Sequence, residues 1–353
     1  MKTLTSKILI TLCTLLVAIG AGAQNKYQTF GPTTSNSNCD YGRQGIQVTD
    51  INDSGQVLGW WCPGGEAYLI NPGDIWTRNI VKTNGNFGAP AQGPIRMNNA
   101  ATIIGQLGPS NRAFYKPWGQ PAQIISVYSG VTVNAINNAG YMAGTSIQDA
   151  PNGQTVVYLT QSQDDEVEIT FPHESGPPWG NDWNSEVVTG LNNSNQIVGS
   201  WEDISTPWSG FFYDGKKLNT TFNMPNAVTT YPTAINDNQE VVGNWFDGNG
   251  VEHGFYWNPT AGFSDIDVTG DTAMGLVAIN NSSVILGWWQ DDNTPTKIHY
   301  VTIVNGQPTA WVNVPKSQAG STVATAINNV GQVVGEYQTQ TGVWRGFIYT
   351  PSK

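Results

Sequence analysis

Ile51-Asn-Asp-Ser-Gly-Gln-Val-Leu-Gly59 is one copy of a motif that occurs seven times in this chain of 353 residues. Every copy places a glycine seven residues after an asparagine, with an apolar pair just before the glycine. The copies are Asn52/Gly59, Asn98/Gly105, Asn137/Gly144, Asn192/Gly199, Asn236/Gly243, Asn280/Gly287 and Asn328/Gly335. One such unit is too small to bury its apolar face alone, so consecutive units must stack. The repeat therefore determines the architecture before it says anything about activity.

Each repeat unit has room for four short strands separated by turns. In the fifth unit the strands are predicted at 233–236, 240–245, 253–257 and 263–267, where β-branched and aromatic residues dominate. Proline and glycine mark the gaps between them. Outside the N-terminal segment no stretch has a convincing helical period, so we expect almost no helix.

Seven four-stranded units predict an all-β fold, a seven-bladed β-propeller in which radial repetition leaves only short, protected edges. The last unit ends after its third strand, Arg345-Gly-Phe-Ile-Tyr349. We predict that Lys26-Tyr-Gln-Thr-Phe30, which precedes the first unit, supplies the missing fourth strand and closes the ring. An open β-solenoid is the main alternative, although its repeats are usually shorter and more regular.

The motif asparagine suits the first position of a type I turn, where its side chain bonds to the backbone. The residue three positions later must tolerate a positive φ angle, as glycine and asparagine do. Four units carry such a residue: Gly55, Gly140, Asn195 and Gly331. Three units do not, and we expect another turn type there: Ala101, Gln239 and Ser283. A ring of asparagine ligands is the alternative, but satisfying backbone groups is the commoner role.

An aromatic residue occurs on the third predicted strand of every unit: Tyr68, Phe114, Tyr158, Phe211, Phe255, Tyr300 and Phe347. Aromatic side chains at equivalent positions are expected to form core layers between neighbouring sheets. The motif glycine then marks the close approach of a neighbouring strand or side chain.

Residues 1–23 have the features of a secretory signal peptide. Lys2 and Lys7 give a positive start, 8–20 is apolar, and Ala21-Gly-Ala23 is a small-residue cleavage site. A membrane anchor is the alternative, but the apolar run is shorter than the roughly 20 residues that a span needs. We therefore expect an exported protein, extracellular or periplasmic, whose residues 24–353 form one propeller domain.

Two cysteines remain after cleavage, Cys39 and Cys62, and an even pair in an oxidising compartment predicts a disulfide. Acidic residues number 26 against 15 basic ones, of which Lys2 and Lys7 belong to the signal peptide. No cluster of Lys or Arg provides the basic surface that phosphate binding requires, so a nucleic-acid partner is not expected. We predict a monomer without membrane insertion.

The segments Ala234-Ile-Asn236, Val241-Val-Gly243 and His253-Gly-Phe255 together resemble the bacterial extracellular HAF repeat. The resemblance covers nearly all of the chain after residue 23. It implies an extracellular repeat protein and no particular activity. Other units carry only part of the His-Gly-Phe element, as in Arg112-Ala-Phe114, which argues against a catalytic role for this triplet.

Three consecutive units share a Gly-x-Trp-x-Asp pattern that ends near a loop. The period of a strand places each tryptophan and its aspartate on one side, so adjacent blades would present them as an arc. The arc consists of Trp201, Asp203, Trp245, Asp247, Trp289 and Asp291. Indole faces stack on sugar rings while carboxylates bind hydroxyl groups, and three carboxylates are also a ligand set for Ca²⁺. The structural alternative is that the tryptophans pack between blades and the aspartates cap turns.

The longest interval between units contains Asp164-Asp-Glu-Val-Glu168 and then His173 and Glu174. The last two residues are either an acid/base pair or part of a solvated loop. His253 and His299 are expected on strands, as hydrogen-bonded core or interface residues. The sequence has no nucleophile motif, zinc spacing or phosphate loop.

These observations predict a secreted, non-catalytic binding propeller that recognises carbohydrate or a cell-surface partner and needs no obligatory cofactor. The alternative is a carbohydrate-active enzyme, a lyase or hydrolase, on the same scaffold. A third hypothesis is an exported repeat protein that acts in adhesion.

Overall fold

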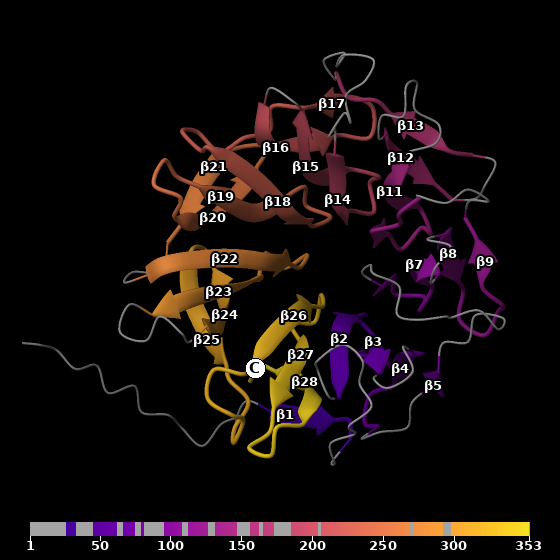
Figure 1. Ribbon diagram of the computed structural model, residues 1–353, viewed down its shortest axis with the longest axis vertical. Helices are drawn as coiled ribbons and strands as arrows, with labels where there is room; N and C mark the ends of the chain where they lie inside the picture. Colours follow the sequence, from indigo (N-terminus) through magenta and orange to yellow (C-terminus); the bar gives the residue numbers. More distant parts are fainter. Residues whose placement is uncertain are drawn as a thin grey trace, which may run out of the picture.

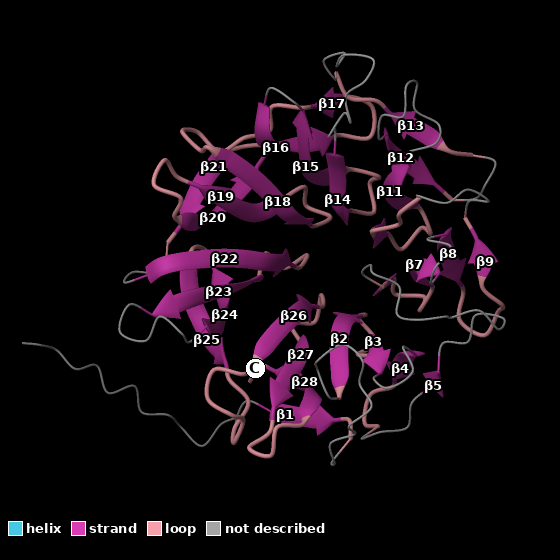
Figure 2. Ribbon diagram, in the orientation of Figure 1, coloured by secondary structure: helices cyan, strands magenta, loops and turns pink. Residues whose placement is uncertain are grey.

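The computed structural model describes residues 26–32, 45–61, 66–74, 79–80, 95–107, 112–125, 131–146, 156–161, 165–172, 185–203, 206–267, 271–291 and 298–352. Their regular secondary structure consists of 28 strands, which form seven sheets of four strands each. The sheets are arranged radially around a central axis (Figures 1 and 2). The predicted all-β, seven-bladed propeller is confirmed.

Neighbouring strands in every blade are antiparallel, and the first strand of a blade lies nearest the axis (Figure 1). Blades one to three are β2 (Ile46–Ile51), β3 (Val57–Trp61), β4 (Glu66–Ile70), β5 (Asn79–Ile80); β6 (Arg96–Met97), β7 (Ile103–Leu107), β8 (Arg112–Lys116), β9 (Gln123–Ile124); and β10 (Ala135–Ile136), β11 (Met142–Ser146), β12 (Val156–Thr160), β13 (Val167–Ile169). Blades four and five are β14 (Ser185–Leu191), β15 (Ile197–Asp203), β16 (Thr206–Tyr213), β17 (Leu218–Asn219); and β18 (Thr229–Ile235), β19 (Val241–Phe246), β20 (Glu252–Asn258), β21 (Gly262–Ile266). Blade six is β22 (Asp271–Ile279), β23 (Ile285–Asp291), β24 (Ile298–Val304), β25 (Gln307–Val312), and blade seven is β26 (Val323–Ile327), β27 (Val333–Gln338), β28 (Trp344–Thr350) and β1 (Lys26–Phe30).

The N-terminal strand β1 completes the last blade, as the sequence predicts. It pairs antiparallel with β28, in a register that runs from Lys26 opposite Thr350 to Phe30 opposite Gly346. Phe30 is fully buried in the core between blades seven and one. Tyr27 also reaches blade six, because the backbone N–H of Asn313 donates to its hydroxyl group at 3.0 Å. The first strand of the described chain therefore joins three blades.

The motif asparagine forms the same turn in all seven blades. The N–H three residues later donates to the asparagine carbonyl at 2.9–3.2 Å. The N–H four residues later donates to the side-chain oxygen at 2.8–3.0 Å. The expectation of another turn type at Ala101, Gln239 and Ser283 is wrong, since their φ angles of 55°, 64° and 58° match the turn at Asn195, 60°. The side-chain cap and the turn hydrogen bonds offset the cost of about 1–2 kcal/mol for this conformation.

The predicted aromatic layers are buried, and six of the seven aromatics lie directly opposite the motif glycine of their blade. The equivalence assigned to Tyr300 is wrong, because Gly287 pairs with Val301 and Tyr300 pairs with Trp288. The glycine is required by close packing. A Cβ atom at Gly243 would lie 2.6 Å from the Phe255 ring and would overlap the Tyr231 carbonyl oxygen.

Several sequence predictions lie outside the described residues: the signal peptide at 1–23, the disulfide between Cys39 and Cys62, and the pair His173 and Glu174. In the described ranges there is no helix with the length and apolar character needed to cross a membrane.

Candidate functional site

The blade topology gives the ring two distinct ends. Because the strands of a blade are antiparallel, the asparagine turns between first and second strands all lie at one end of the axis, here termed the turn face. The loops between second and third strands lie at the other end, the loop face. The Gly-x-Trp-x-Asp segments end β15, β19 and β23 in three consecutive blades and therefore belong to the loop face.

Trp201 is buried between blades three and four, with 7 % of its surface exposed. Its indole N–H donates to the carbonyl of Thr220 at 2.8 Å, and its ring lies 5.6 Å from that of Phe171. Trp201 is thus a core residue and offers no free ring face to a ligand. Asp203 is the last residue of β15, and its side chain lies outside the described part.

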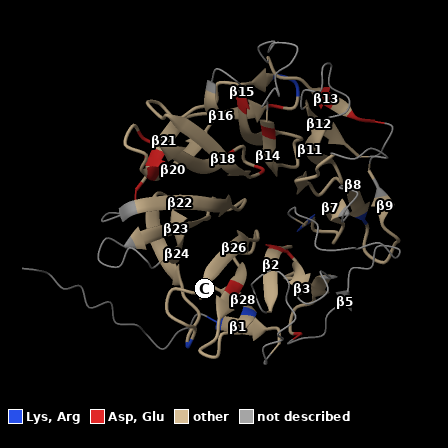
Figure 3. Cartoon of the chain, viewed as in Figure 1, with Lys and Arg blue, Asp and Glu red and all other residues tan. Residues whose placement is uncertain are grey.

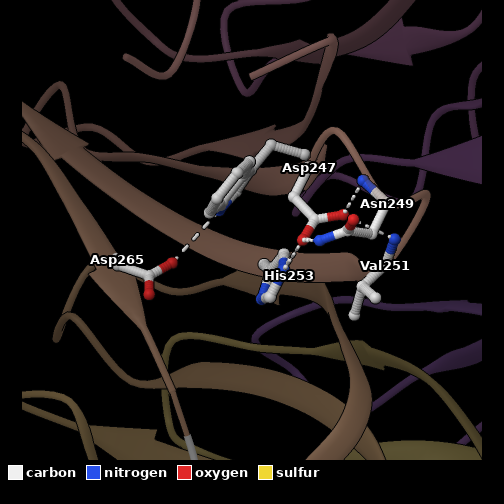
Figure 4. Close-up of polar contacts among 6 residues, drawn as sticks. Asp247, Asn249, Val251, His253 and Asp265 are labelled. Carbon is white, nitrogen blue, oxygen red and sulfur yellow. Dashed lines mark hydrogen bonds and ion pairs between the residues drawn. The ribbon is translucent and has the colours of Figure 1, made fainter. Parts of the chain in front are cut away.

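Trp245 is half-buried and stacks on His253, with ring centroids 4.5 Å apart and planes at 24°. The two residues are directly opposite on β19 and β20. The indole N–H donates to Asp265 on β21 at 3.1 Å, so one side-chain row crosses three strands (Figure 4).

Asp247 caps the hairpin between β19 and β20 (Figure 4). Its Oδ1 accepts the N–H groups of Val251 at 2.9 Å and Asn249 at 2.8 Å, and these bonds lower the pKa of the carboxyl group. Its Oδ2 lies 3.8 Å from Nε2 of His253. The turn repeats the geometry of the asparagine turns, with Gly250 at a φ of 79°. Oδ1 of Asp247 therefore stabilises its own loop through these two hydrogen bonds.

Blade six repeats the arrangement of blade five. Trp289 stacks on His299, with centroids 5.0 Å apart and planes at 25°. Trp311 on β25 lies 5.4 Å from Trp289 and is 47 % exposed. Trp311 pairs with Val301 and Asp265 pairs with Phe255, and both of these third-strand residues lie opposite the motif glycine of their blade. Trp311 therefore occupies in blade six the position that Asp265 occupies in blade five. We call the side chains Trp245, His253, Trp289, His299 and Trp311 the aromatic ladder.

The structure brings only part of the predicted arc together. Trp245 and Trp289 occupy equivalent places on neighbouring blades, and Asp291 ends β23 with its side chain outside the described part. Asp and Glu residues are spread over several blades (Figure 3), and the described side chains contain no group of three acids, histidines or cysteines that fits a metal ion. A Ca²⁺ site formed by Asp203, Asp247 and Asp291 remains a prediction.

The turn face carries a second site, which the sequence predictions did not include. An acidic or amide residue follows every motif asparagine, namely Asp53, Asn99, Asn138, Asn193, Asp237, Asn281 and Asn329. The N–H of each donates to the side-chain Oδ1 of its counterpart in the next blade at 2.8–2.9 Å, and the bond from Asn329 to Asp53 closes the circle. The seven successive Asn-Asn or Asn-Asp pairs were the signal in the sequence.

The motif asparagines form a parallel circle of hydrogen bonds. Six of them donate from Nδ2 to the carbonyl of the motif asparagine in the next blade at 2.9–3.0 Å. One of these bonds, from Asn328 to Asn52, joins the last blade to the first. We call the two circles together the amide belt. It satisfies turn groups and links neighbouring blades at the same time.

The amide belt surrounds a cavity of about 240 Å³ on the axis, to which all seven blades contribute. Two members of the second circle are carboxylates, and each accepts amide N–H groups from both neighbours. Oδ2 of Asp53 accepts from Asn99 at 2.6 Å and Asn329 at 3.0 Å. Oδ2 of Asp237 accepts from Asn193 and Asn281, each at 2.7 Å.

Glu240 connects the belt to blade six, and this contact predicts a pH dependence of stability. Its carboxylate accepts hydrogen bonds of 2.7 Å from the hydroxyls of Ser283 and Tyr256, and another from the Asn236 amide. Burial alone would raise its pKa, but these bonds outweigh burial and hold the pKa below the ordinary 4.5. A lowered folded-state pKa stabilises the protein above the unfolded-state pKa, and the contribution disappears as pH falls through the folded value.

The variant Glu240→Gln should therefore be less stable than the parent at pH ~7, with a difference that shrinks as the pH falls below ~4. Urea unfolding of both proteins across this range measures the difference. A difference that is equally large at both ends of the range would show that Glu240 acts by packing and not through its charge.

Comparisons with known proteins place the chain in the structural class of β-propellers. A scan against protein-family models found no match, and a sequence search of curated proteins also found none. Among solved structures, the β-propeller domain of the trilobed protease from Pyrococcus furiosus matches with a TM-score of 0.58 and 8 % identity over 87 % of this chain and 94 % of that one. Virginiamycin B lyase from Staphylococcus aureus matches with a TM-score of 0.55 and 11 % identity over 93 % and 100 %. YCF48 from Cyanidioschyzon merolae gives 0.53 and 9 % over 92 % and 98 %.

Identities this low establish the fold alone. The similar structures include the propeller domain of a protease and a lyase, so the shared scaffold selects no single activity.

Proposed function

We propose that this protein is a secreted, non-catalytic propeller that binds carbohydrate through the aromatic ladder on the loop face of blades five and six. The observation that carries the proposal is the repeated Trp–His stack, extended in blade six by the half-exposed Trp311. Sugar rings offer apolar C–H faces that pack on indole, while their hydroxyls bind polar groups at the rim.

The ladder is organised before any ligand arrives. Cross-strand pairing fixes Trp289 opposite His299, and Trp245 opposite His253. Trp311 packs against Trp289 on the same side of blade six. A ligand would order few additional side chains on binding, which reduces the entropic cost of association. Two neighbouring blades with the same arrangement suit a ligand that is itself a chain of similar units.

Export supports a ligand outside the cell. The signal-peptide features of residues 1–23 and the resemblance to the bacterial extracellular HAF repeat support export. The excess of acidic over basic residues also disfavours nucleic acid as the ligand.

A carbohydrate-active enzyme is the second candidate, and the described carboxylates near the ladder favour a binder over it. A glycoside hydrolase needs two carboxyl groups roughly 5–10 Å apart that are free to act on the sugar. Asp247 has one oxygen bound to two backbone N–H groups, and Asp265 accepts the indole N–H of Trp245. Both carboxylates therefore have structural partners.

The variant Trp311→Ala tests the proposal, with Trp118→Ala as the matched control. Both tryptophans are about half exposed, at 47 % and 45 %, but Trp118 follows β8 in blade two, away from the ladder. On a glycan array, and by calorimetry with the best glycan, we expect Trp311→Ala to weaken binding about tenfold or more, as the loss of a stacked ring implies. The control should bind like the parent.

Two results would reject the binding function. One is a parent protein that binds no glycan on the array; the other is equal binding by the parent and Trp311→Ala. Incubation of the parent with polysaccharides distinguishes the enzyme hypothesis from the binding hypothesis, because new reducing ends or unsaturated products would show that the protein is catalytic.

A further inference from the structure

We infer that the axial cavity inside the amide belt binds a short aliphatic diamine, with one ammonium group held near Asp53 and the other near Asp237. The site lies at the turn face, at the opposite end of the axis from the aromatic ladder. The inference therefore does not depend on the proposed carbohydrate function.

The lining of the cavity favours a cationic hydrogen-bond donor. Its side chains include Asp50, Asp53 and Asp237 but no Lys, Arg or His. Each Oδ1 of the second circle accepts one backbone N–H of the belt, and an oxygen of this type has a second lone pair that can accept another donor. The backbone N–H groups of the second circle all point from blade to blade. The carboxylates add negative charge to this lining, which therefore favours a cation over a neutral or anionic ligand.

The two belt carboxylates, Asp53 and Asp237, are far from one another, and they differ from the third carboxylate of the lining, Asp50. The Asp50 carboxylate accepts hydrogen bonds from the backbone N–H groups of Ile51 and Met97, at 2.9 Å each, and is attracted to Arg96. Asp53 belongs to blade one and Asp237 to blade five, which is as far apart as two blades in a ring of seven can be. Two separated carboxylates match two ammonium groups joined by an aliphatic chain better than they match one cation.

The carboxylates are not needed to close the belt. Five of the seven positions in the second circle carry asparagine and make the same backbone contact at 2.8–2.9 Å. Asp53 and Asp237 make this backbone contact as well, and each adds a negative charge and a second oxygen that accepts the side-chain amides of both neighbours. Both residues are half-buried, so the charges are accessible from the cavity.

The size of the cavity limits the ligand. A volume of about 240 Å³ far exceeds the roughly 10–15 Å³ that one water needs and is below the ~300–1,000 Å³ typical of larger organic ligands. A slender four- or five-carbon diamine with a few waters fits this volume.

The test uses the protein from Gln24 onward with putrescine as the probe and butylamine, which has a single ammonium group, as the matched ligand. Calorimetry and thermal melts should show that putrescine binds at least tenfold more tightly than butylamine and raises the melting temperature more. This comparison needs no variant. The variants Asp53→Asn and Asp237→Asn should each lose about tenfold in putrescine affinity, and the double variant should lose discrimination between the two amines.

Asp265→Asn on the loop face serves as the control variant, because it removes one negative charge far from the cavity and should leave putrescine binding unchanged. Melts without ligand report whether the belt variants are folded. The inference is overturned if the parent binds putrescine no better than butylamine, or if the double variant, folded, binds putrescine as the parent does. Loss of glycan binding in any of these proteins would concern the loop face and not this site.

Discussion

Deletion of the N-terminal strand should prevent stable folding. A chain that starts at Gly31 lacks β1, so β28 becomes an open edge and the fully buried Phe30 side chain is lost from the core between blades seven and one. Removal of one buried phenylalanine ring alone costs about 3–5 kcal/mol, against a total stability of about 5–15 kcal/mol for a typical domain. The five backbone pairs of β1 and the contact of Tyr27 with blade six are lost as well.

Circular dichroism melts of the chain from Gln24 and the chain from Gly31 measure this effect. Deletion of residues 351–353 is the control, because they follow the end of β28 and take no part in its pairing. We expect the control to melt near the parent and the Gly31 chain to show no cooperative transition. A Gly31 chain that melts within a few degrees of the parent would mean that the ring does not depend on β1.

Replacement of a motif glycine by alanine should destabilise the protein far more than the same change in a loop. A Cβ at Gly243 would overlap the Tyr231 carbonyl and press on the Phe255 ring, and backbone cannot move aside as a flexible side chain can. Overpacking of this kind costs about 1–3 kcal/mol or more. Gly248, in the next loop of the same blade, has nothing within 4 Å of the corresponding position.

Urea unfolding of Gly243→Ala and Gly248→Ala provides the comparison. The first variant should lose about 1–3 kcal/mol or more, and the second should change by less than about 0.5 kcal/mol. Equal stabilities of the two variants would contradict the close packing of the second strand against its neighbours.

The repeat predicted the architecture because one local pattern, the asparagine turn, recurs with its strands around it. The turn lies within seven residues, so its chemistry can be read from neighbouring positions. The ring of blades and the role of Lys26–Phe30 follow from counting strands, since an incomplete last unit needs a partner from elsewhere. These inferences depend on residues that are near in sequence or on the number of strands in each unit.

Apart from the turn type at Ala101, Gln239 and Ser283, which is a matter of local backbone conformation, the predictions that failed depend on register or on partners in another blade. Tyr300 was placed one residue out because unit six has adjacent aromatics on both strands, Trp288–Trp289 and His299–Tyr300, and only the hydrogen-bond ladder shows which one faces Gly287. Trp201 shares its pattern with Trp245 and Trp289, but its contact with Phe171 comes from blade three. A repeated motif therefore does not establish equal exposure.

The amide belt was missed for a related reason. The residue after each motif asparagine is polar and faces a turn, which by itself is unremarkable in sequence. Its hydrogen-bond partner is in the next blade, 39 to 55 positions away for six of the bonds and 276 positions away for the bond that closes the ring. Only the sevenfold recurrence of the pair, from Asn52-Asp53 to Asn328-Asn329, indicated a shared role.

The axial cavity, to which all seven blades contribute, requires a closed ring. A designed disulfide tests that closure most directly. Lys26 and Thr350 are opposite one another at the ends of β1 and β28, at a separation that a cross-strand disulfide can bridge. After oxidation of Lys26→Cys/Thr350→Cys, mass spectrometry should find the peptides that carry positions 26 and 350 linked to each other. The peptides that carry positions 26 and 260 should not be linked when Lys26→Cys is combined with the exposed Thr260→Cys of blade five. If the first pair stays unlinked, or both link equally, the N-terminal strand does not close the propeller.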